Sequence, residues 1–217
     1  WAAAAPNAID MIGGTSGTFN GSMTHGAGFV TGDGSSSYFD SGATPSAMGI
    51  STGDAFILRG IHASPATASV TQTASCGVAA SSATASLAML NGATGHALAG
   101  QTYFRQPSTS GGPIITGQGA DYRGIYIGSS TATDSRFLLR RRSGGTTVVS
   151  STVNDTQSIY NGNPYFLSRN VSGSADYHTT QSEFAWALGT GMTQAQAGDF
   201  TAALETMWET CTGLTLF

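Results

Sequence analysis

Short apolar stretches separated by glycine-rich turns run through nearly all of this 217-residue chain. Most are too short for a typical helix, and several alternate with a two-residue period, which is typical of strands. Thirty residues are glycine, and Asn-Gly pairs at positions 20–21, 91–92 and 161–162 are turn signals, the first two read as hairpin turns. We count about twelve strands in this pattern. It restricts the chain to an all-β sandwich or jelly roll.

Two stretches predict strands with defined faces. Residues 55–61 place Ile57, Arg59 and Ile61 on one face and the residues between them on the other. In residues 184–188, Phe184, Trp186 and Leu188 alternate with alanines, so both faces are apolar. The second stretch therefore predicts a central strand that is covered on both sides.

A single helical pattern follows that strand. Thr193 and Gln196 have the spacing of a capping box, and Gly213 stands where a glycine ends a helix. The pattern predicts a helix over about residues 193–211 that covers part of a sheet. The apolar positions that recur at helical spacing are Ala197, Phe200, Leu204, Met207, Trp208 and Cys211.

The composition narrows the possible partners. Only 9% of residues are charged, every basic residue is Arg, and the net charge is −4. We therefore expect no nucleic-acid partner and no membrane insertion, since no apolar run approaches the length of a membrane-spanning helix. A hydrophobic fraction of 40% excludes a disordered chain of low hydrophobicity and high charge. The start of the chain lacks signal-peptide features, so we expect a processed chain or a part of a longer product.

The chain has two cysteines, Cys76 and Cys211, too few for a disulfide framework. We expect two buried thiols, because free cysteine is among the most buried residue types. A single bridge between a strand and the C-terminal helix is the alternative.

Several segments together resemble a known family. They are residues 184–189 (FAWALG), the turn around Met192, the helix ending near Gly213, and upstream residues 6–10 (PNAID), 137–145 (FLLRRRSGG) and 163–169 (NPYFLSR). This combination resembles the concanavalin A-like, laminin-G-like jelly-roll domains of bacteriophage tail and virion structural proteins. The resemblance implies one concanavalin A-like β-sandwich domain over residues 1–217, with one C-terminal helix.

The resemblance also implies a function and a location. We expect a non-enzymatic protein of the virion surface, in a tail, fibre or capsid-associated position. It would be a homo-oligomer, would contact other virion proteins, and would recognise or adhere to a host-surface glycan. A purely structural decoration or assembly protein is the alternative. A secreted lectin-like domain is the third expected function, and a degenerate glycosidase is the last.

Enzyme signatures are missing from the sequence. Related glucanases need paired carboxylates on one strand, whereas the three glutamates, Glu183, Glu205 and Glu209, do not form such a run. The chain also lacks a Gly-x-Ser-x-Gly elbow, a His-x-x-x-His pair and any lysine for a phosphate-binding loop. We therefore expect no catalytic residues.

Metal binding is only weakly indicated. Asp33, Asp40 and Asp121 are the candidate calcium ligands, because related lectin-like domains hold calcium through loop oxygens. No clustered Asp-x-Asp pattern accompanies them, and turn capping is the ordinary explanation for such residues. We expect no cofactor and no metal site, with calcium as the minor alternative.

Two tyrosine-containing segments are candidate ligand-binding sites. Asp121, Tyr122 and Arg123 follow a glycine-rich stretch, and Tyr160 and Asn161 precede a turn. Carbohydrate sites combine flat aromatic rings with planar polar groups, and both segments offer that combination. Core packing of the tyrosines is the alternative.

The Arg140-Arg141-Arg142 run suggests a basic patch, but alternation along a strand splits it between two faces. Arg140 and Arg142 would share one face and Arg141 the other. We expect a solvated hairpin, or an arginine paired across a subunit contact.

Overall fold

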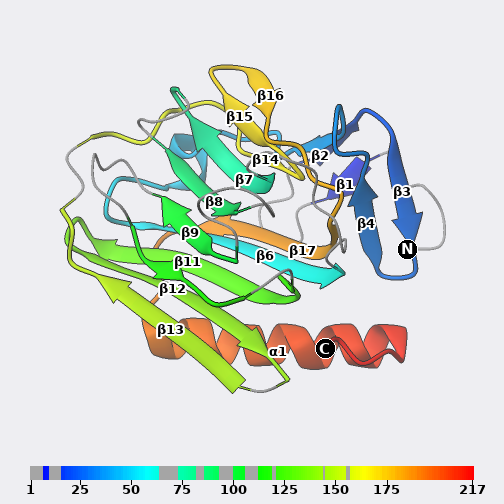
Figure 1. Ribbon diagram of the computed structural model, residues 1–217. Coiled ribbons are helices and arrows are strands. Elements are labelled where there is room, and N and C mark those ends of the chain that lie inside the picture. Colours follow the sequence, from blue (N-terminus) through cyan, green and yellow to red (C-terminus); the bar gives the residue numbers. More distant parts are fainter. Residues whose placement is uncertain are drawn as a thin grey trace.

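The chain folds into two packed β-sheets and one C-terminal helix (Figure 1). The computed structural model describes residues 7–9, 16–63, 73–81, 86–92, 100–105, 112–118, 121–143, 145–154 and 157–217. All described strand pairs are antiparallel except β15 with β7. The predicted all-β class with one late helix is confirmed, although the strands are more numerous and shorter than expected.

The first sheet has ten strands. In spatial order its main path is β1 (Asn7–Ile9), β2 (Ser16–Asn20), β5 (Tyr38–Asp40), β14 (Tyr165–Phe166), β7 (Thr73–Ala79), β8 (Leu87–Asn91), β9 (Thr102–Arg105) and β10 (Ile114–Ile115). Strand β15 (Arg169–Val171) joins β7, and β16 (Ser174–Asp176) pairs with β15. Residues 6 and 10, at the ends of one family-like segment, lie outside the described residues.

The second sheet has seven strands. Its order is β13 (Gly145–Ser151), β12 (Ser135–Arg142), β11 (Gly124–Ala132), β6 (Ala55–Ala63), β17 (Ser182–Gly189), β4 (Phe29–Gly32) and β3 (Met23–Gly26). Strand β17 lies between β6 and β4, as predicted for a central strand. The faces predicted for residues 55–61 are also confirmed, because Ile57 and Ile61 pack between the sheets whereas Phe56 and Leu58 pack on the helix side.

A β-bulge at Phe184 corrects the predicted faces of β17. The register between β17 and β6 shifts around this residue. Phe184 packs on the helix side over Gly60, where an added Cβ would lie 2.4 Å from the Phe184 ring. Trp186 and Leu188 pack between the sheets. Phe184 therefore does not share their face, because the extra residue of a bulge reverses the alternation.

Two Asn-Gly pairs that were predicted as hairpin turns are placed differently. Asn20-Gly21 connects β2 of the first sheet to β3 of the second. Strand β8 pairs antiparallel with β9, the predicted return strand, but Asn91-Gly92 is not a two-residue turn between them, because Asn91 pairs with Thr102. Gly21 does adopt the expected positive φ of 76°. The Asn-Gly pair thus sets the local backbone angle, while strand pairing is decided by distant residues.

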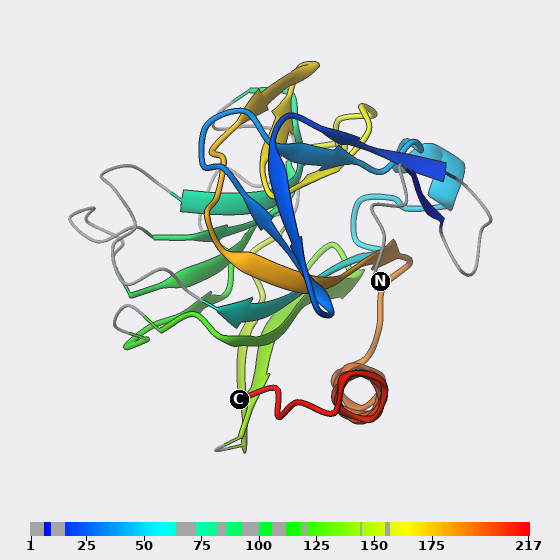
Figure 2. The same ribbon diagram turned by 90° about the vertical axis from the view of Figure 1, so that its right-hand side faces the viewer.

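The helix α1 (Gln194–Thr212) has the predicted ends. Thr193 Oγ1 accepts from the Gln196 amide at 3.3 Å, and Gln196 Oε1 accepts from the Thr193 amide at 2.9 Å. Gly213 follows with φ 69°. Trp208 anchors the helix to the second sheet by donating from Nε1 to the Gly28 carbonyl at 3.0 Å. Figure 2 shows the helix end-on beside the outer face of this sheet.

The helix buries a narrower stripe than the apolar pattern indicates. Met207 is 49% exposed and Cys211 is also exposed. Both positions lie to one side of the line through Ala197 and Trp208 that meets the sheet. Cys76 lies in the core between the sheets, so the prediction of two buried thiols is wrong for Cys211, and both thiols are free.

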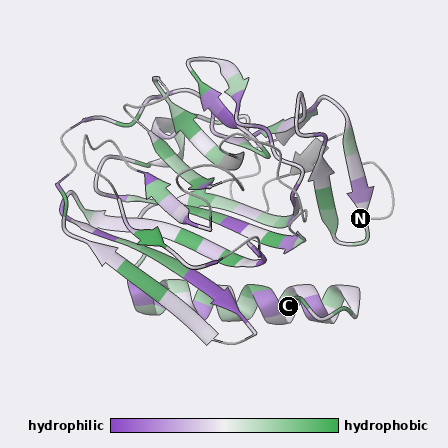
Figure 3. Ribbon diagram, viewed as in Figure 1, coloured by the Kyte–Doolittle hydropathy of each residue, from purple (hydrophilic) through white to green (hydrophobic). Residues whose placement is uncertain are grey.

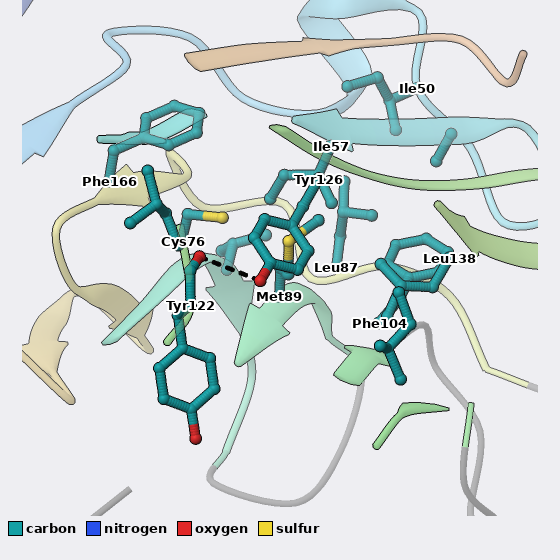
Figure 4. Close-up of a cluster of buried hydrophobic side chains, with 14 of the residues drawn as sticks. Ile50, Ile57, Cys76, Leu87, Met89, Phe104, Tyr122, Tyr126, Leu138 and Phe166 are labelled. Atoms are coloured by element: carbon teal, nitrogen blue, oxygen red, sulfur yellow. Dashed lines mark hydrogen bonds between the residues drawn. The ribbon is translucent and has the colours of Figure 1, made fainter. Parts of the chain in front are cut away.

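The main core fills the space between the two sheets (Figure 4). At one end of this core, the Trp186 ring stacks with two phenylalanine rings. The ring centroid of Trp186 lies 5.1 Å from that of Phe39 and 5.3 Å from that of Phe166, and the interplanar angle is 18° in both pairs. A second core lies between the second sheet and α1. Polar and apolar residues accordingly alternate along the strands and around the helix (Figure 3).

Candidate functional site

The outward side of β5 and β14 carries a pair of stacked tyrosines. Phe39 and Phe166 of these strands point into the core, so their neighbours Tyr38 and Tyr165 lie on the opposite side of the sheet. The two tyrosine rings stack with their centroids 4.4 Å apart and with an interplanar angle of 25°. Tyr165 is buried by this packing, whereas Tyr38 stays partly exposed. Tyr38 therefore offers an aromatic face at the surface.

A carboxylate stands beside the tyrosine pair. Asp40 lies two residues from Tyr38 on β5 and opposite Tyr165 in the register. Its Oδ1 accepts from Asn163 Nδ2 at 3.0 Å and from the Gly42 amide at 2.9 Å. No residue in the described part of the chain donates a hydrogen bond to Oδ2. Asp40 is thus held in place while one oxygen remains available as an acceptor.

Tyr160, on the loop before β14, packs against the core between the sheets. Burial raises the pKa of Tyr165, and the nearby Asp40, Tyr38 and Tyr160 raise it further. We call Tyr38, Asp40, Tyr165 and Asn163 the tyrosine face.

The loop before β14 carries the two predicted site residues Tyr160 and Asn161. Asn161 Oδ1 accepts from the Ser46 amide at 3.1 Å, at the start of the 3-10 helix η1 (Ser46–Met48). The carbonyl of Asn163 accepts from Asn170 Nδ2 at 2.7 Å. These two contacts attach the loop to η1 and to β15 (Arg169–Val171) of the first sheet.

Sequence reasoning missed Tyr38 and Tyr165 as site residues. The available signal was a tyrosine next to a phenylalanine in two short strands, which places the two rings on opposite faces. The pairing of β5 with β14 could not be read from the sequence, because the two strands are far apart along the chain.

The other predicted segment is placed differently. Tyr122 is buried, with its hydroxyl donating to the Gly92 carbonyl and accepting from the Gly100 amide at 2.9 Å. Burial raises its pKa. The carbonyl of Tyr122 also accepts from the Tyr126 hydroxyl at 3.0 Å (Figure 4). The Tyr122 ring therefore packs inside the sandwich, which is the core-packing alternative.

Asp121 and Arg123 form an ion-pair cluster at the ends of β11 and β12. The Arg123 guanidinium, with that of Arg142, holds the pKa of Asp121 well below its usual range. Arg123 Nε lies 2.9 Å from Asp121 Oδ1, and an Arg142 nitrogen lies 2.8 Å from Oδ2. Both carboxylate oxygens are thus paired within the chain. No hydrogen bond or ion pair among the described residues links this cluster to the tyrosine face.

The arginine run alternates faces as predicted, with Arg140 buried and Arg141 and Arg142 partly exposed. Arg140 is buried, donates to the carbonyls of Asp121 at 2.7 Å and Arg123 at 2.8 Å, and lies over the Tyr126 ring. Arg141 points to the helix side and pairs with Glu205 at 2.5 Å. The expectation of a solvated hairpin is therefore wrong for Arg140, whose charge is taken by carbonyls of the same chain.

The candidate calcium ligands act as turn caps. Asp33 Oδ1 accepts from the amides of Ser35 at 2.9 Å and Ser36 at 2.8 Å. Although burial opposes the shift, these hydrogen bonds hold the pKa of Asp33 well below its usual range. In the described residues, no three His, Cys, Asp or Glu side chains gather at one place.

A buried ion pair lies behind the tyrosine face, between the two sheets. Arg59 and Glu183 form a salt bridge with both side chains fully buried. The carboxylate also accepts from Trp186 Nε1 at 2.5 Å, and Gln181 Oε1 accepts from Arg59 at 2.8 Å. Although burial opposes it, Glu183 raises the pKa of Arg59. The bulge at Phe184 makes this possible, because it turns Glu183 and Trp186 to the same side.

Further hydrogen bonds extend the pair into the first sheet. Asn91 Nδ2 lies 3.3 Å from Gln181 Oε1, and Thr102 Oγ1 donates to Asn91 Oδ1 at 3.1 Å. Gln118 then donates to Thr102 Oγ1 at 2.9 Å and accepts from the Tyr126 hydroxyl at 2.7 Å. We call this chain of contacts from Glu183 to Tyr126 the inter-sheet network. Its groups are buried, so it stabilises the sandwich and offers no solvent-facing site.

Arg169 is another buried cation. Its guanidinium lies 4.5 Å from the Tyr177 ring centroid and 3.7 Å from the Asp176 carboxylate, and none of the described residues accepts a hydrogen bond from its nitrogens. Burial lowers its pKa. The stacking and the nearby carboxylate compensate the charge beneath the β15–β16 hairpin.

No family model matches the chain, and no curated protein or solved structure shows significant similarity to it. Within the described residues, no helix is long and apolar enough to cross a membrane.

Proposed function

We propose that this chain is a non-enzymatic, lectin-like module of a bacteriophage virion surface that recognises or adheres to a host glycan through the tyrosine face. The observation that carries the proposal is the stacked pair of Tyr38 and Tyr165 beside the acceptor Asp40. The apolar face of a sugar ring packs against an aromatic ring, while hydroxyls need fixed polar acceptors and donors. Tyr38 would supply the first contact and Asp40 the second.

The fold and the charge support this proposal. A sandwich with one covering helix agrees with a concanavalin A-like, laminin-G-like jelly roll, and this finer fold assignment is part of the proposal. The low content of charged residues suits a neutral ligand such as a glycan. Placement on a tail, fibre or capsid surface rests on the family resemblance alone.

A glycan-binding screen with matched variants tests the proposal. We expect selective binding by the native chain, a loss of at least about tenfold in affinity for Tyr38→Ala, and a smaller loss for Tyr38→Phe, which keeps the ring. Asp40→Asn should weaken binding, since a carboxylate acceptor is stronger than an amide. The control is Tyr103→Ala, because Tyr103 is a partly exposed tyrosine on β9 away from this face.

Two outcomes would contradict the proposal. One is a folded chain that binds no glycan, and the other is an equal loss of binding in Tyr38→Ala and Tyr103→Ala. The screen should be run with and without added calcium, because loss of binding on chelation would point to a metal-dependent site elsewhere.

A purely structural decoration or assembly protein is the second candidate. One observation favours it: β13 is an exposed edge strand without charged residues, which suits contact between protein chains. A negative glycan screen together with co-purification of the chain with particles would support this function.

A further inference from the structure

Strand β13 ends the second sheet with one side open. It pairs only with β12 among the described strands, from Ser151 opposite Arg136 to Gly145 opposite Arg142, without a register shift. Residues 145–148 and 150 are exposed, and Val148 is 40% exposed. Strand β10 of the first sheet approaches β13 but does not pair with it. Backbone groups along one side of β13 are therefore accessible.

This edge lacks the features that normally prevent pairing with another chain. Edge strands are usually short, charged, bulged or interrupted by proline. The sequence of β13, GTTVVSS, has seven residues and none of these features. The other described edge strands are shorter: β10 has two residues, β1 three and β3 four. The edge of β13 is thus the one best suited to extend the sheet.

Neighbouring charges do not oppose the approach of a second copy. All four arginines of β12 that face β13 have partners within the chain. Arg141 pairs with Glu205 and Arg142 with Asp121. Arg140 donates to the carbonyls of Asp121 and Arg123, and Arg136 donates to the carbonyl of Val153. Two copies of β13 would meet without charged side chains on either strand. A partner with the same neutral edge is therefore compatible, whereas a charged strand would gain no ion pair here.

The sequence of β13 is also compatible with itself. Antiparallel pairing of two copies over the whole of Gly145–Ser151 places Val148 opposite its own counterpart. It also places Thr147 opposite Val149, and Thr146 opposite Ser150. Cross-strand pairs of β-branched side chains stabilise antiparallel sheets.

We propose that β13 pairs antiparallel with β13 of a second copy of this chain, joining the two second sheets about a two-fold axis. Because this axis is perpendicular to the joined sheet, α1 of both copies lies on the same outer face. Val148 is on that outer face, as its neighbour Val149 packs towards the core between the sheets and Ser150 receives a hydrogen bond from Gln194 of α1. The dimer does not depend on glycan binding.

Site-specific cross-linking tests the register directly. In a Cys211→Ser background, Val148→Cys should form a disulfide-linked dimer under mild oxidation, because facing residues have the Cα separation that a disulfide needs. The matched control is Ser150→Cys, since two copies of Ser150 would be about 13 Å apart along the strands. Equal cross-linking of both variants, or cross-linking of neither, would overturn the proposal.

Sedimentation of the chain without cross-links gives an independent measurement. We expect a concentration-dependent dimer, and Val148→Lys should weaken it at least about tenfold by placing two like charges together. Met207→Lys, a change at another exposed apolar residue, should leave it unchanged. A native chain that stays monomeric up to about 0.1 mM would also overturn the proposal. Glycan binding by such a monomer would leave the proposed function intact, so the two failures are distinguishable.

Discussion

Cys76 and Cys211 show how the surroundings of a side chain set its chemistry. Cys76 is fully enclosed in the core between the sheets, where burial raises its pKa to about 12. Cys211 is exposed near the end of α1. The two thiols therefore differ in access, and at neutral pH the Cys76 thiol stays protonated.

The thiol of Cys76 predicts a loss of stability at alkaline pH. Its pKa is raised from 9.0 in the unfolded chain to about 12 in the folded chain. The contribution of the protonated thiol to the free energy of unfolding is therefore fully present below pH 9. It is lost as the pH rises towards 12, by about 1.4 kcal/mol per pH unit. Urea unfolding between pH 8 and pH 11 should show a smaller pH dependence for Cys76→Ala than for the native chain.

The comparison between the two proteins isolates this thiol, because the buried tyrosines titrate equally in both. A thiol reagent at pH 8 should modify one cysteine in the folded chain and two after unfolding. Identical pH slopes for the native chain and Cys76→Ala would contradict the prediction.

The helix α1 and the strand before it show how far local sequence decides an element. The capping box of Thr193 and Gln196 and the glycine after the helix act within a few residues, and they form as predicted. The predicted face of Phe184 was wrong, because its bulge depends on packing against Gly60 of another strand.

The helix cap predicts that a substitution at one residue lowers the free energy of unfolding. Thr193→Ala removes the side-chain acceptor for the Gln196 amide and should lower the free energy of unfolding by about 1 kcal/mol. Thr193→Ser should retain most of the stability. The control is Thr206→Ala in the middle of the helix, where alanine is the better helix former and no loss is expected. Equal losses at the two threonines in urea unfolding would argue against the cap.

At the scale of the whole molecule, the inter-sheet network joins the two layers of the sandwich. Arg59 and Glu183 belong to the second sheet, and Asn91 and Thr102 to the first. A buried ion pair contributes little net stability, but loss of one partner leaves an uncompensated charge. The network therefore makes the stability of the sandwich sensitive to single changes within it.

Glu183→Gln should lower the free energy of unfolding by about 3–5 kcal/mol, because it leaves Arg59 buried without its anion. Joint replacement by apolar residues, Arg59→Met with Glu183→Leu, should recover most of this loss. The measurement is urea unfolding of the single and double variants. A double variant that is less stable than Glu183→Gln would show that the ion pair itself stabilises the fold.

Much of the candidate site depended on contacts that the sequence does not reveal. Of the predicted residues, Tyr160 packs against the core between the sheets, and the tyrosine face forms only because β5 pairs with β14. Tyr122 looked equivalent to Tyr160 in sequence, yet its ring is buried. Short tyrosine-containing segments carry no local signal that separates a surface ring from a core ring.

The sequence by itself determined the strand-rich class, the two faces of β6, the central position of β17, and both ends of α1. These follow from side-chain period, glycine angles and capping, which act over a few neighbouring residues. Only the tertiary structure decided the bulge at Phe184, the buried Arg59–Glu183 pair and the partners of each strand. These depend on contacts between residues far apart along the chain, whose free energies favour one pairing only after both sheets have packed.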